Sequence, residues 1–398
     1  MKKPSLQSCE AVLRGNDRGR YTVPSPKLYP HQWAWDSAFA AIGWAYLDPA
    51  RAWLELATLM DTAWDDGRIP HVYYHDLRGD YAPRPEFWET ERTSTVSQPP
   101  VWASAIRRIA EITGDLESAR PLLAAVDASH RWFADQRDPL GWNAVSVAHP
   151  WESGMDNLPA WDAPMADVDV SDAPAFERRD TAVVGHADQR PTDDHYARYA
   201  ALVKGIARDG FGHGSFAVYD PFMTAVLARA EQDLAWLGAQ LGVQTDAADR
   251  HAALRRGLET KLWDEDAGRY LYWDARANRA ITSDVVGCYL PLYCDIEATR
   301  ANRLREGLAA RFDTAWGIPT ASPRDPGFEP RRYWRGPVWI NVNWLLAEAL
   351  PPAHTERTLE LVAHGGIHEY YEPNTGEGLG AERFTWTAAL CLDLMQRS

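Results

Sequence analysis

The chain has 398 residues, and its formal net charge is −15. That length suits one large domain or two average ones, and the acidic balance argues against a nucleic-acid surface, which needs clustered Lys and Arg. No run of 18 apolar residues occurs, so we expect no membrane partner. The N-terminus lacks the apolar segment of a signal peptide, and the four cysteines form no CxxC pair, so they are typical of reduced thiols. A cytoplasmic protein is predicted.

Helical periodicity runs along the whole chain. Asp48 and Pro49 form an N-cap and a first-turn proline, and an apolar stripe follows them at helical spacing. About ten to twelve helices and few strands are predicted by this reading. One hairpin is expected over 263–274, with its turn at 266–268. No linker rich in Pro, Gly or Ser divides the chain, so residues 1–398 are predicted to form a single all-α domain of paired helices. The other stripes cover 106–110, 122–133, 227–241, 251–262, 304–312 and 345–350.

Tryptophan is the compositional outlier, with 19 residues, many of them in loop-like stretches. Four Trp-rich segments each precede a helical stripe and contain Gly together with a carboxylate or Arg. In a barrel of paired helices such positions gather at one end and form a pocket. Aromatic walls with polar edges suit a sugar ring. The segments are HQWAWDSAF (31–39), WESGMDNLPAWD (151–162), YWRGPVWINVNW (333–344) and TGEGLGAERFTWTAAL (375–390).

Several other kinds of site are excluded by the local sequence. GEGLGA at 376–381 resembles a dinucleotide loop, but no strand precedes it and no acidic residue follows at the required spacing. The segment 167–178 begins like a calcium loop, yet Asp172 stands where glycine is needed. The two histidines of HVYYH (71–75) have metal-ligand spacing only on a helix, and Pro70 with the β-rich sequence argues against that helix. We expect no metal.

The combination of ESG-x-D, WDS, RGPVW and a terminal Gly-Glu-Gly followed by F-x-W-T resembles the clan of (α/α)6-barrel glycosidases, which contains trehalases and processing α-glucosidases. The full string WESGMDN and the compact length are most similar to bacterial glucosylglycerate and mannosylglycerate hydrolases, in glycoside hydrolase family 63. The resemblance extends from about Tyr29 to Trp386. It implies a single (α/α)6 barrel with Trp-rich rim loops, no cofactor, and a small glycoside as the bound partner.

Inverting glycoside hydrolysis needs one carboxylic acid and one carboxylate on opposite faces of the sugar. Asp156 matches the acid of the family by its place in ESG-x-D, and the flanking tryptophans would raise its pKa. A helix cap before Pro159 is the structural alternative for Asp156. Glu152 shares this environment and is expected to orient loops.

The base has two main candidates in the terminal segment. Related trehalases carry their base nine residues before the Trp of the terminal motif, and this spacing selects Glu377 over Glu382. The glycines beside Glu377 would allow close approach to a water and the sugar. The alternative for Glu382 is a surface salt bridge, and Glu372 ranks third.

The remaining pocket residues follow from their motif positions. In the WDS region, Asp36 is expected to bind sugar hydroxyls. Arg190, in the HADQRPTDDHY stretch, is the candidate cation for the carboxylate of a glycerate group, with a loop salt bridge to nearby aspartates as its alternative. Core packing is the alternative for Trp35 and Trp339. The expected substrate-binding residues are Tyr29, Trp33, Trp35, Asp36, Gln98, Trp151, Gly154, Arg190, Tyr196, Tyr333 and Trp339, with Arg335 in the same RGPVW wall.

The resemblance therefore predicts an inverting, exo-acting glycoside hydrolase that cleaves an α-glycosidic bond to a small carboxylate-bearing aglycone, with mannosylglycerate or glucosylglycerate as substrate. The aperiodic loops 66–92 and 162–195 are expected to close over it. A trehalase or another α-glucosidase on the same barrel is the alternative, and a non-catalytic carbohydrate-binding protein is the alternative of another class. A barrel epimerase would need paired histidines, which the motifs do not supply. A homodimer is considered, and the sequence does not decide between glucose and mannose.

Overall fold

The computed structural model describes residues 3–78, 81–176 and 178–397. Both predicted lid loops include positions outside this range, 79–80 in the first and 177 in the second. Within the described range, no helix has the length and the apolar character that crossing a membrane requires.

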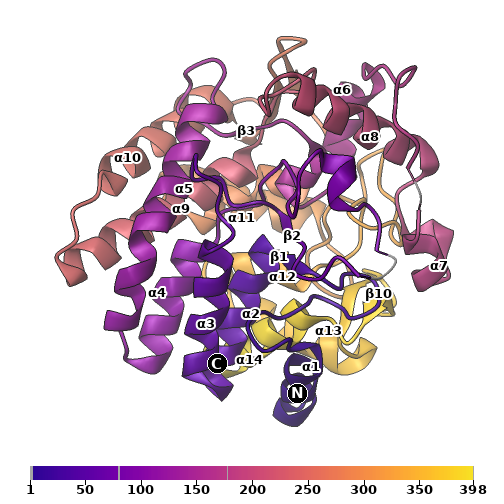
Figure 1. Cartoon of the computed structure of the whole chain (residues 1–398). Helices are drawn as coiled ribbons and strands as arrows, with labels where there is room; N and C mark the ends of the chain where they lie inside the picture. The colour runs from indigo at the N-terminus through magenta and orange to yellow at the C-terminus, as the bar shows by residue number, and fades with distance from the viewer. Residues whose placement is uncertain (1–2, 79–80, 177, 398) are drawn as a thin grey trace.

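Helices dominate the architecture (Figure 1). Their contacts divide the barrel helices into an outer and an inner ring that alternate along the chain. The outer helices are α1 (Leu6–Asn16), α3 (Pro49–Met60), α5 (Leu123–Gln136), α10 (Ala247–Gly257), α11 (Ala298–Arg311) and α13 (Pro352–Gly365). The inner elements are α2 (Ala34–Leu47), α4 (Trp102–Thr113), α9 (Pro221–Leu241), the pair of short 3₁₀ turns η7 (Val286–Cys288) and η8 (Leu290–Tyr293), α12 (Ile340–Leu346) and α14 (Thr385–Arg397).

The inner elements close into a ring. Helix α2 packs on α4, α4 on α9, α9 on η8, η8 on α12, α12 on α14, and α14 back on α2. Helix α2 is buried on every side from Ala34 to Ala45, which is the pattern of a helix surrounded by others. Outer helices such as α11 bury only one stripe. Six inner and six outer elements in alternation form the (α/α)6 barrel, so the predicted fold class is confirmed.

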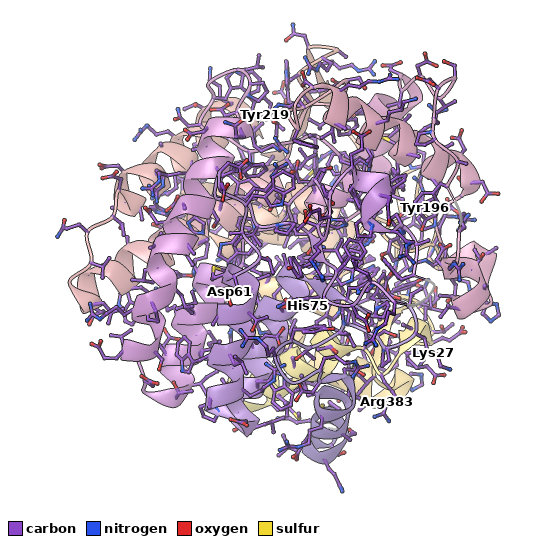
Figure 2. All side chains as sticks on the ribbon, viewed as in Figure 1. Lys27, Asp61, His75, Tyr196, Tyr219 and Arg383 are labelled. Carbon is purple, nitrogen blue, oxygen red and sulfur yellow. The ribbon has the colours of Figure 1, made fainter. Side chains whose placement is uncertain are left out.

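The side chains drawn in Figure 2 fill the interior of this ring, and one continuous apolar core joins the helices. The N-cap prediction at Asp48 is confirmed, because its carboxylate accepts the Arg51 N–H at 3.1 Å and Pro49 occupies the first turn of α3. The stripe at 345–350 mostly follows α12 rather than forming a helix. Pro351 and Pro352, expected to end that stripe, instead begin α13, because proline is well suited to the first turn of a helix.

Short antiparallel strands connect the helices at one end of the barrel. The predicted hairpin is present but shorter, since Trp263 pairs with Tyr270, while Tyr272–Asp274 joins a separate four-stranded sheet of order β3-β4-β7-β8. The strands are β1 (Gln32–Trp33), β2 (Val72–Tyr73), β3 (Ser146–Val147), β4 (Val218–Tyr219), β5 (Trp263–Asp264), β6 (Arg269–Tyr270), β7 (Tyr272–Asp274), β8 (Arg279–Ile281), β9 (His368–Tyr371) and β10 (Gly378–Glu382).

The long segment between α5 and α9 contains structure that the sequence did not suggest. It includes the helices α6 (Asp162–Ala166), α7 (Asp180–Val184) and α8 (Asp193–Arg208), which lie at the top and right of Figure 1. The other short helical turns are η1 (Pro85–Trp88), η2 (Glu117–Leu122), η3 (Pro150–Ser153), η4 (Pro159–Trp161), η5 (Ala187–Gln189) and the π-helical turn η6 (Leu258–Leu262).

Candidate active site

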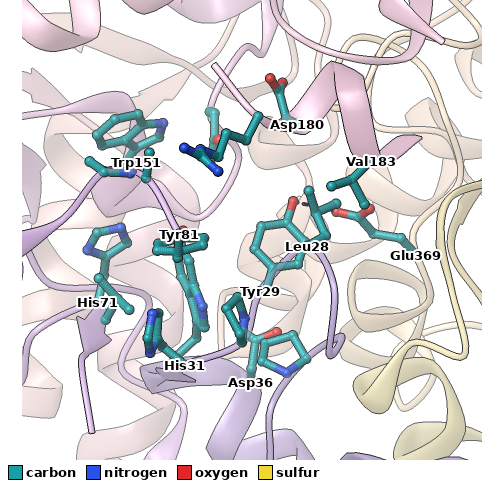
Figure 3. A pocket seen from close by; sticks show the side chains of 18 of the residues that line it. Leu28, Tyr29, His31, Asp36, His71, Tyr81, Trp151, Asp180, Val183 and Glu369 are labelled. Carbon is teal, nitrogen blue, oxygen red and sulfur yellow. Dashed lines mark hydrogen bonds between the residues drawn. The ribbon is translucent and has the colours of Figure 1, made fainter. Parts of the chain in front are cut away.

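A cavity of about 510 Å³ opens at the end of the barrel where the inner helices begin. Its wall is built by the connections that precede α2, α4 and α12 and by the segments between α5 and α9. The volume lies in the range of small-molecule sites. The cavity brings together eleven of the thirteen residues predicted for the site: Tyr29, Trp33, Trp35, Asp36, Gln98, Trp151, Gly154, Asp156, Arg190, Tyr196 and Tyr333. Some of them are drawn in Figure 3.

The WESGMD segment packs against Trp35 through its glycine, Gly154. Gly154 has φ +70°, and a Cβ there would lie 2.7 Å from the ring of Trp35, so only glycine fits beneath that indole. Trp35 itself is held by the side-chain oxygen of Gln98, which accepts its backbone N–H at 3.1 Å. Glu152 does not reach the cavity. Its carboxylate is fully buried, is bonded to Arg137 at 2.9 Å, and accepts the backbone N–H groups of Ser97 and Ala148, contacts that suit the expected role in orienting loops.

Asp156 is the last residue of this segment and lies in the turn after η3, with its backbone oxygen held by the Tyr199 hydroxyl at 2.9 Å. Burial raises the pKa of Asp156 to about 7, although the Arg190 guanidinium opposes that shift. The neighbouring Glu369 carboxylate raises the pKa further. No side chain caps the turn at Pro159, so Asp156 is not the cap of that turn. A carboxyl that is protonated near neutral pH and faces a cavity is suited to general-acid chemistry.

The second predicted carboxylate is elsewhere. The side chain of Glu377 is 53% exposed, is absent from the cavity wall, and forms two hydrogen bonds with Arg331 at 2.6 and 3.2 Å. Its flanking glycines serve the tight turn between β9 and β10, where a Cβ on Gly378 would lie 2.3 Å from the His368 ring. The ion pair lowers the pKa of Glu377. Glu377 therefore lies outside the cavity, and the prediction that the base stands at this position is wrong.

The other two glutamates considered are also unsuited to the role. Glu382 is exposed at the end of β10, opposite His368. Glu372 is buried, but its carboxylate accepts the backbone N–H groups of Asn374 and Thr375 and so closes the turn after β9.

The carboxylate that does reach the cavity is Glu369, on β9, and it is 1% exposed. Its Oε1 accepts the Tyr29 hydroxyl at 2.9 Å, and its Oε2 accepts the Ala381 N–H at 3.0 Å. Figure 3 shows this side chain beside Tyr29, across the cavity from Trp151. Burial raises the pKa of Glu369, and Arg190 opposes the rise. The sequence offered one signal for it, an acidic residue between aromatic-rich strand positions in HEYY, which the spacing argument passed over.

Arg190 is buried and lies between several pocket groups. Its Nη2 donates to the Tyr29 hydroxyl at 3.0 Å, its Nη1 lies 3.5 Å from Glu369, and its Nε lies 3.2 Å from Asp180. The guanidinium also stacks on the Tyr333 ring at 4.0 Å. The aspartates that the sequence placed near Arg190 pair with other residues instead, since Asp188, Asp193 and Asp194 contact Arg331, Arg178 and Arg198.

Two residues of the RGPVW wall differ from expectation. Trp339 is fully buried behind the cavity and stacks on Trp334 with ring centroids 3.6 Å apart, so its alternative, core packing, is correct. Trp334 lines the cavity in its place. Arg335 is tied to Asp162 through two hydrogen bonds of 2.7 and 2.8 Å and holds the loop before α6.

Two predicted loops contribute the outer wall. Tyr81 from the first and Phe176 and Asp180 from the second line the cavity. The loops also touch each other, because Phe87 and Phe176 pack edge to face at 5.4 Å. Tyr196 stacks on Phe176 at 5.0 Å, and its hydroxyl donates to Asp180 at 3.0 Å. The remaining wall residues, which lie in the predicted segments but were not predicted individually, include His31, His71, Tyr74, Trp88, Trp334, Phe384 and Trp386.

The two histidines of the cavity are kept uncharged. Burial lowers the pKa of His31 to about 4 and the pKa of His71 well below its usual value. Strand β2 follows His71, so the 71–75 segment is not the helix that a paired metal site would have required. Across the described part of the chain, no cluster of three or more His, Cys, Asp or Glu side chains has a metal-binding arrangement.

Comparison with known proteins agrees with this geometry. Residues 29–387 match the family model described as the mannosylglycerate hydrolase MGH1-like glycoside hydrolase domain. A mannosylglycerate hydrolase of Thermus thermophilus is 40% identical over 418 aligned residues, covering 96% of this chain and 98% of the relative. A glucosylglycerate hydrolase of Mycolicibacterium hassiacum is 34% identical over 427 residues, covering 96% and 95%.

A solved structure extends the similarity to three dimensions. The crystal structure of the GH63 mannosylglycerate hydrolase from a second strain of Thermus thermophilus, in complex with Tris and D-glycerate, superposes with a TM-score of 0.94 at 39% identity. The match covers 99% of this chain and 100% of the other. With the barrel, the enclosed carboxylates and these matches in agreement, the chain belongs to the MGH1-like family of glycoside hydrolases.

Proposed function

We propose that this enzyme hydrolyses the α-glycosidic bond of a hexose linked to a small carboxylate-bearing alcohol, with mannosylglycerate or glucosylglycerate as substrate, and with inversion at the anomeric carbon. The observation that carries the proposal is the enclosure of Asp156, Glu369 and Arg190 in one cavity. An inverting mechanism needs two carboxyl groups, one as acid and one as base, and the buried cation suits an anionic leaving group. The named activities of the relatives support the same substrate class.

Asp156 is the proposed general acid. Its pKa of about 7 keeps a proton on the carboxyl group in weakly acidic and neutral solution. That proton passes to the glycosidic oxygen as the bond to the anomeric carbon breaks, so the glycerate leaves as a neutral alcohol at its reacting oxygen.

Glu369 replaces Glu377 as the proposed general base. It has to be ionised to accept a proton from the attacking water, and the Arg190 guanidinium beside it favours the ionised form against the effect of burial. Tyr29 and the Ala381 N–H fix both carboxylate oxygens, so the side chain is held in one orientation. Such preorganisation lowers the entropic cost of aligning the water.

Sugar and aglycone are assigned to different sides of the cavity. Asp36 is the proposed ligand of sugar hydroxyls, since it lies buried in the wall at the start of α2. Arg190 is the proposed partner of the aglycone carboxylate because an Arg binds a carboxylate through parallel N–H bonds. Its present partner Asp180 belongs to the second loop, so a bound carboxylate would compete with Asp180 for the guanidinium.

The loops 66–92 and 162–195 are proposed to act as a lid. The two loops meet through Phe87 and Phe176, and each contributes an aromatic side chain to the cavity wall, Tyr81 from the first and Phe176 from the second. Closing a lid excludes water and strengthens the electrostatic contacts inside. Limited proteolysis with and without D-glycerate and the hexose measures this, and equal cleavage of both loops in the two conditions would contradict a lid.

A hydrolysis screen tests the proposed function. The purified enzyme is incubated separately with mannosylglycerate, glucosylglycerate, the neutral analogue glucosylglycerol and trehalose, and reducing sugar is measured at several substrate concentrations. Proton NMR of the first product reports its anomeric configuration. The expected result is the highest kcat/KM for a glycosylglycerate and a β-configured first product. A preference for trehalose would replace the proposal by a trehalase, and a retained α-configuration would exclude inversion. Binding without any sugar release would leave a carbohydrate-binding protein.

Two further properties belong to the proposal. A cytoplasmic location fits the four cysteines, which are all buried and unpaired. A homodimer stays a prediction, and the elution volume of the purified protein in size-exclusion chromatography with light scattering decides it.

A further inference from the structure

The proposed base sits on a hairpin with an irregularity directly beside it. In the pairing of β9 and β10, Leu379 faces Tyr370 and Glu382 faces His368, so Gly380 and Ala381 together face Glu369. Two residues opposite one define a β-bulge, a feature that is common next to active sites because it redirects side chains. The glycine of this bulge has φ +68°, and a Cβ there would lie 2.4 Å from Oε2 of Glu369.

The bulge turns two successive N–H groups toward different partners. The Ala381 N–H binds Oε2 of Glu369 at 3.0 Å, and the Gly380 N–H binds the side-chain oxygen of Gln189 at 3.0 Å. The backbone oxygen of Gln189 accepts the Tyr370 hydroxyl at 2.7 Å. Gln189 therefore contacts both strands of the hairpin, at Tyr370 beside Glu369 on β9 and at Gly380 opposite Glu369 on β10.

Gln189 also precedes Arg190, whose guanidinium approaches the other carboxylate oxygen of Glu369. Gln189 is 4% exposed and ends the 3₁₀ turn η5, after a run of exposed residues in the second loop. A buried amide that binds across to a distant strand fixes the chain at that point. The anchored Gln189 thus sets the position of the bulge and of Arg190 at the same time.

We propose that Gln189 is a positioning residue for the general base: its amide oxygen holds the Gly380–Ala381 bulge in the form that orients Glu369 toward the attacking water. Gln189 is not among the residues that line the cavity, so it acts through the bulge. The inference rests on the proposed role of Glu369. It differs from two other roles that Gln189 could have, which are to anchor the loop or to present Arg190 to the aglycone.

The ionisable groups that face Glu369 come from every surrounding segment. They are Tyr29 from the segment before β1, Asp36 from α2, Asp156 from the turn after η3, Arg190 from the end of the second loop, and Tyr333 from the segment before α12. Without the Gln189 bond, Glu369 loses the Ala381 N–H and the close Arg190, both of which favour the carboxylate. The loss raises its pKa, so the acidic limb of the kcat profile moves to higher pH.

The experiment uses Gln189→Met, which keeps the shape of the side chain and removes the acceptor, and measures two substrates. One is the preferred glycosylglycerate. The other is the α-glycosyl fluoride of the same sugar, in which water attacks the anomeric carbon, fluoride leaves without protonation, and the water proton passes to Glu369. The fluoride has no aglycone and needs no general acid, so its turnover reports on the base. Asp156→Asn is the control for this point. It should keep fluoride turnover within about tenfold of the wild type, because a substrate that needs no general acid avoids the loss of about 10²–10⁴-fold.

The expected result is a fall in kcat of about 10- to 100-fold for Gln189→Met with both substrates, because a small misplacement of a reacting group has effects of this order. KM should stay within about twofold, and the acidic limb should shift upward. Gln240→Met, the same change on the exposed end of α9, is the matched control and should behave as the wild type.

Each other outcome overturns the inference in a distinct way. If only glycosylglycerate turnover falls, Gln189 serves the aglycone through Arg190. If both substrates keep wild-type kcat, the bulge does not depend on Gln189. If Gln189→Met does not fold, Gln189→Asn keeps the amide but withdraws its oxygen from the Gly380 N–H and must reproduce the loss on the fluoride, and wild-type fluoride turnover in that variant would refute the inference. A wild type that hydrolyses no glycosylglycerate but does hydrolyse the fluoride refutes the proposed substrate and leaves the positioning role testable.

Discussion

Replacing Asp156 with Asn separates the catalytic and the energetic consequences of one carboxyl group in the cavity wall. The amide has the same shape and cannot donate a carboxyl proton, so kcat for a glycosylglycerate should fall by about 10²–10⁴, the usual contribution of an acid–base group. In the wild type, the same proton should disappear as the pH rises through the pKa of about 7, which gives the basic limb of the kcat profile.

The same substitution, Asp156→Asn, should lower kcat but raise the stability of the fold above neutral pH. The pKa of Asp156 is higher in the folded enzyme than the reference value of 3.8, so ionisation above pH 3.8 favours the unfolded chain. Wild-type stability is therefore full below that value and is lost as the pH rises to about 7, beyond which the loss is constant. Three pKa units correspond to about 4 kcal/mol, and the open side of the cavity reduces this to about 2–4 kcal/mol.

The Asn variant avoids this loss, because an amide has no charged form to desolvate. With an unfolding entropy of about 2.1 cal/mol/K per residue, the gain corresponds to a rise in Tm of about 2–5 °C at pH 8. Thermal unfolding followed by circular dichroism at pH 4 and pH 8 measures the difference between variant and wild type. The reasoning predicts a small difference at pH 4 and a clear stabilisation at pH 8. A difference that is the same at both values would refute the raised pKa.

Three further predictions concern single side chains. Glu369→Gln should lower kcat by about 10²–10⁴ and Glu377→Gln by less than about twofold, and steady-state rates that show the reverse would return the base to Glu377. Arg190→Ala should lower kcat/KM for a glycosylglycerate by about 10- to 150-fold through loss of a charge-assisted contact, with a smaller loss for glucosylglycerol, and equal losses would assign Arg190 to Glu369 alone. Glu152→Gln should leave Arg137 buried without its counter-ion and lower the free energy of unfolding by about 3–5 kcal/mol, measured by urea denaturation, whereas a loss under about 1 kcal/mol would contradict this view of the pair.

Much of the architecture follows from the sequence because the relevant forces act over a few residues. Helical spacing of apolar residues is local, so the alternation of helices and the single domain could be predicted without the structure. The strings WESGMD and RGPVW also determine their own turns, and WDS lies in the first turn of α2. Gly154 beneath Trp35 is an example, since only this residue type allows the packing that brings Asp156 to the cavity.

The identity of the base depended on contacts between distant segments. Glu369 and Glu377 lie on the same hairpin, and the residues around each are equally consistent with a pocket. Which of them points inward depends on strand register, on the bulge at Gly380, and on Arg331, which binds Glu377 at the surface. A shift of one residue reverses the face of a strand side chain, so spacing to a later tryptophan does not determine it.

The same reason explains the wall behind the cavity and the proposed role of Gln189. Trp334 and Trp339 are both apolar and five residues apart, and their stacking decides that the first faces the cavity and the second faces the core. Gln189 and Gly380 are 191 residues apart in the chain, and their hydrogen bond exists only because the barrel closes. The sequence by itself determined which segments meet at the rim, through local turns and helix starts. The tertiary structure decided which side chains of those segments face the substrate, because register and packing between distant segments set that choice.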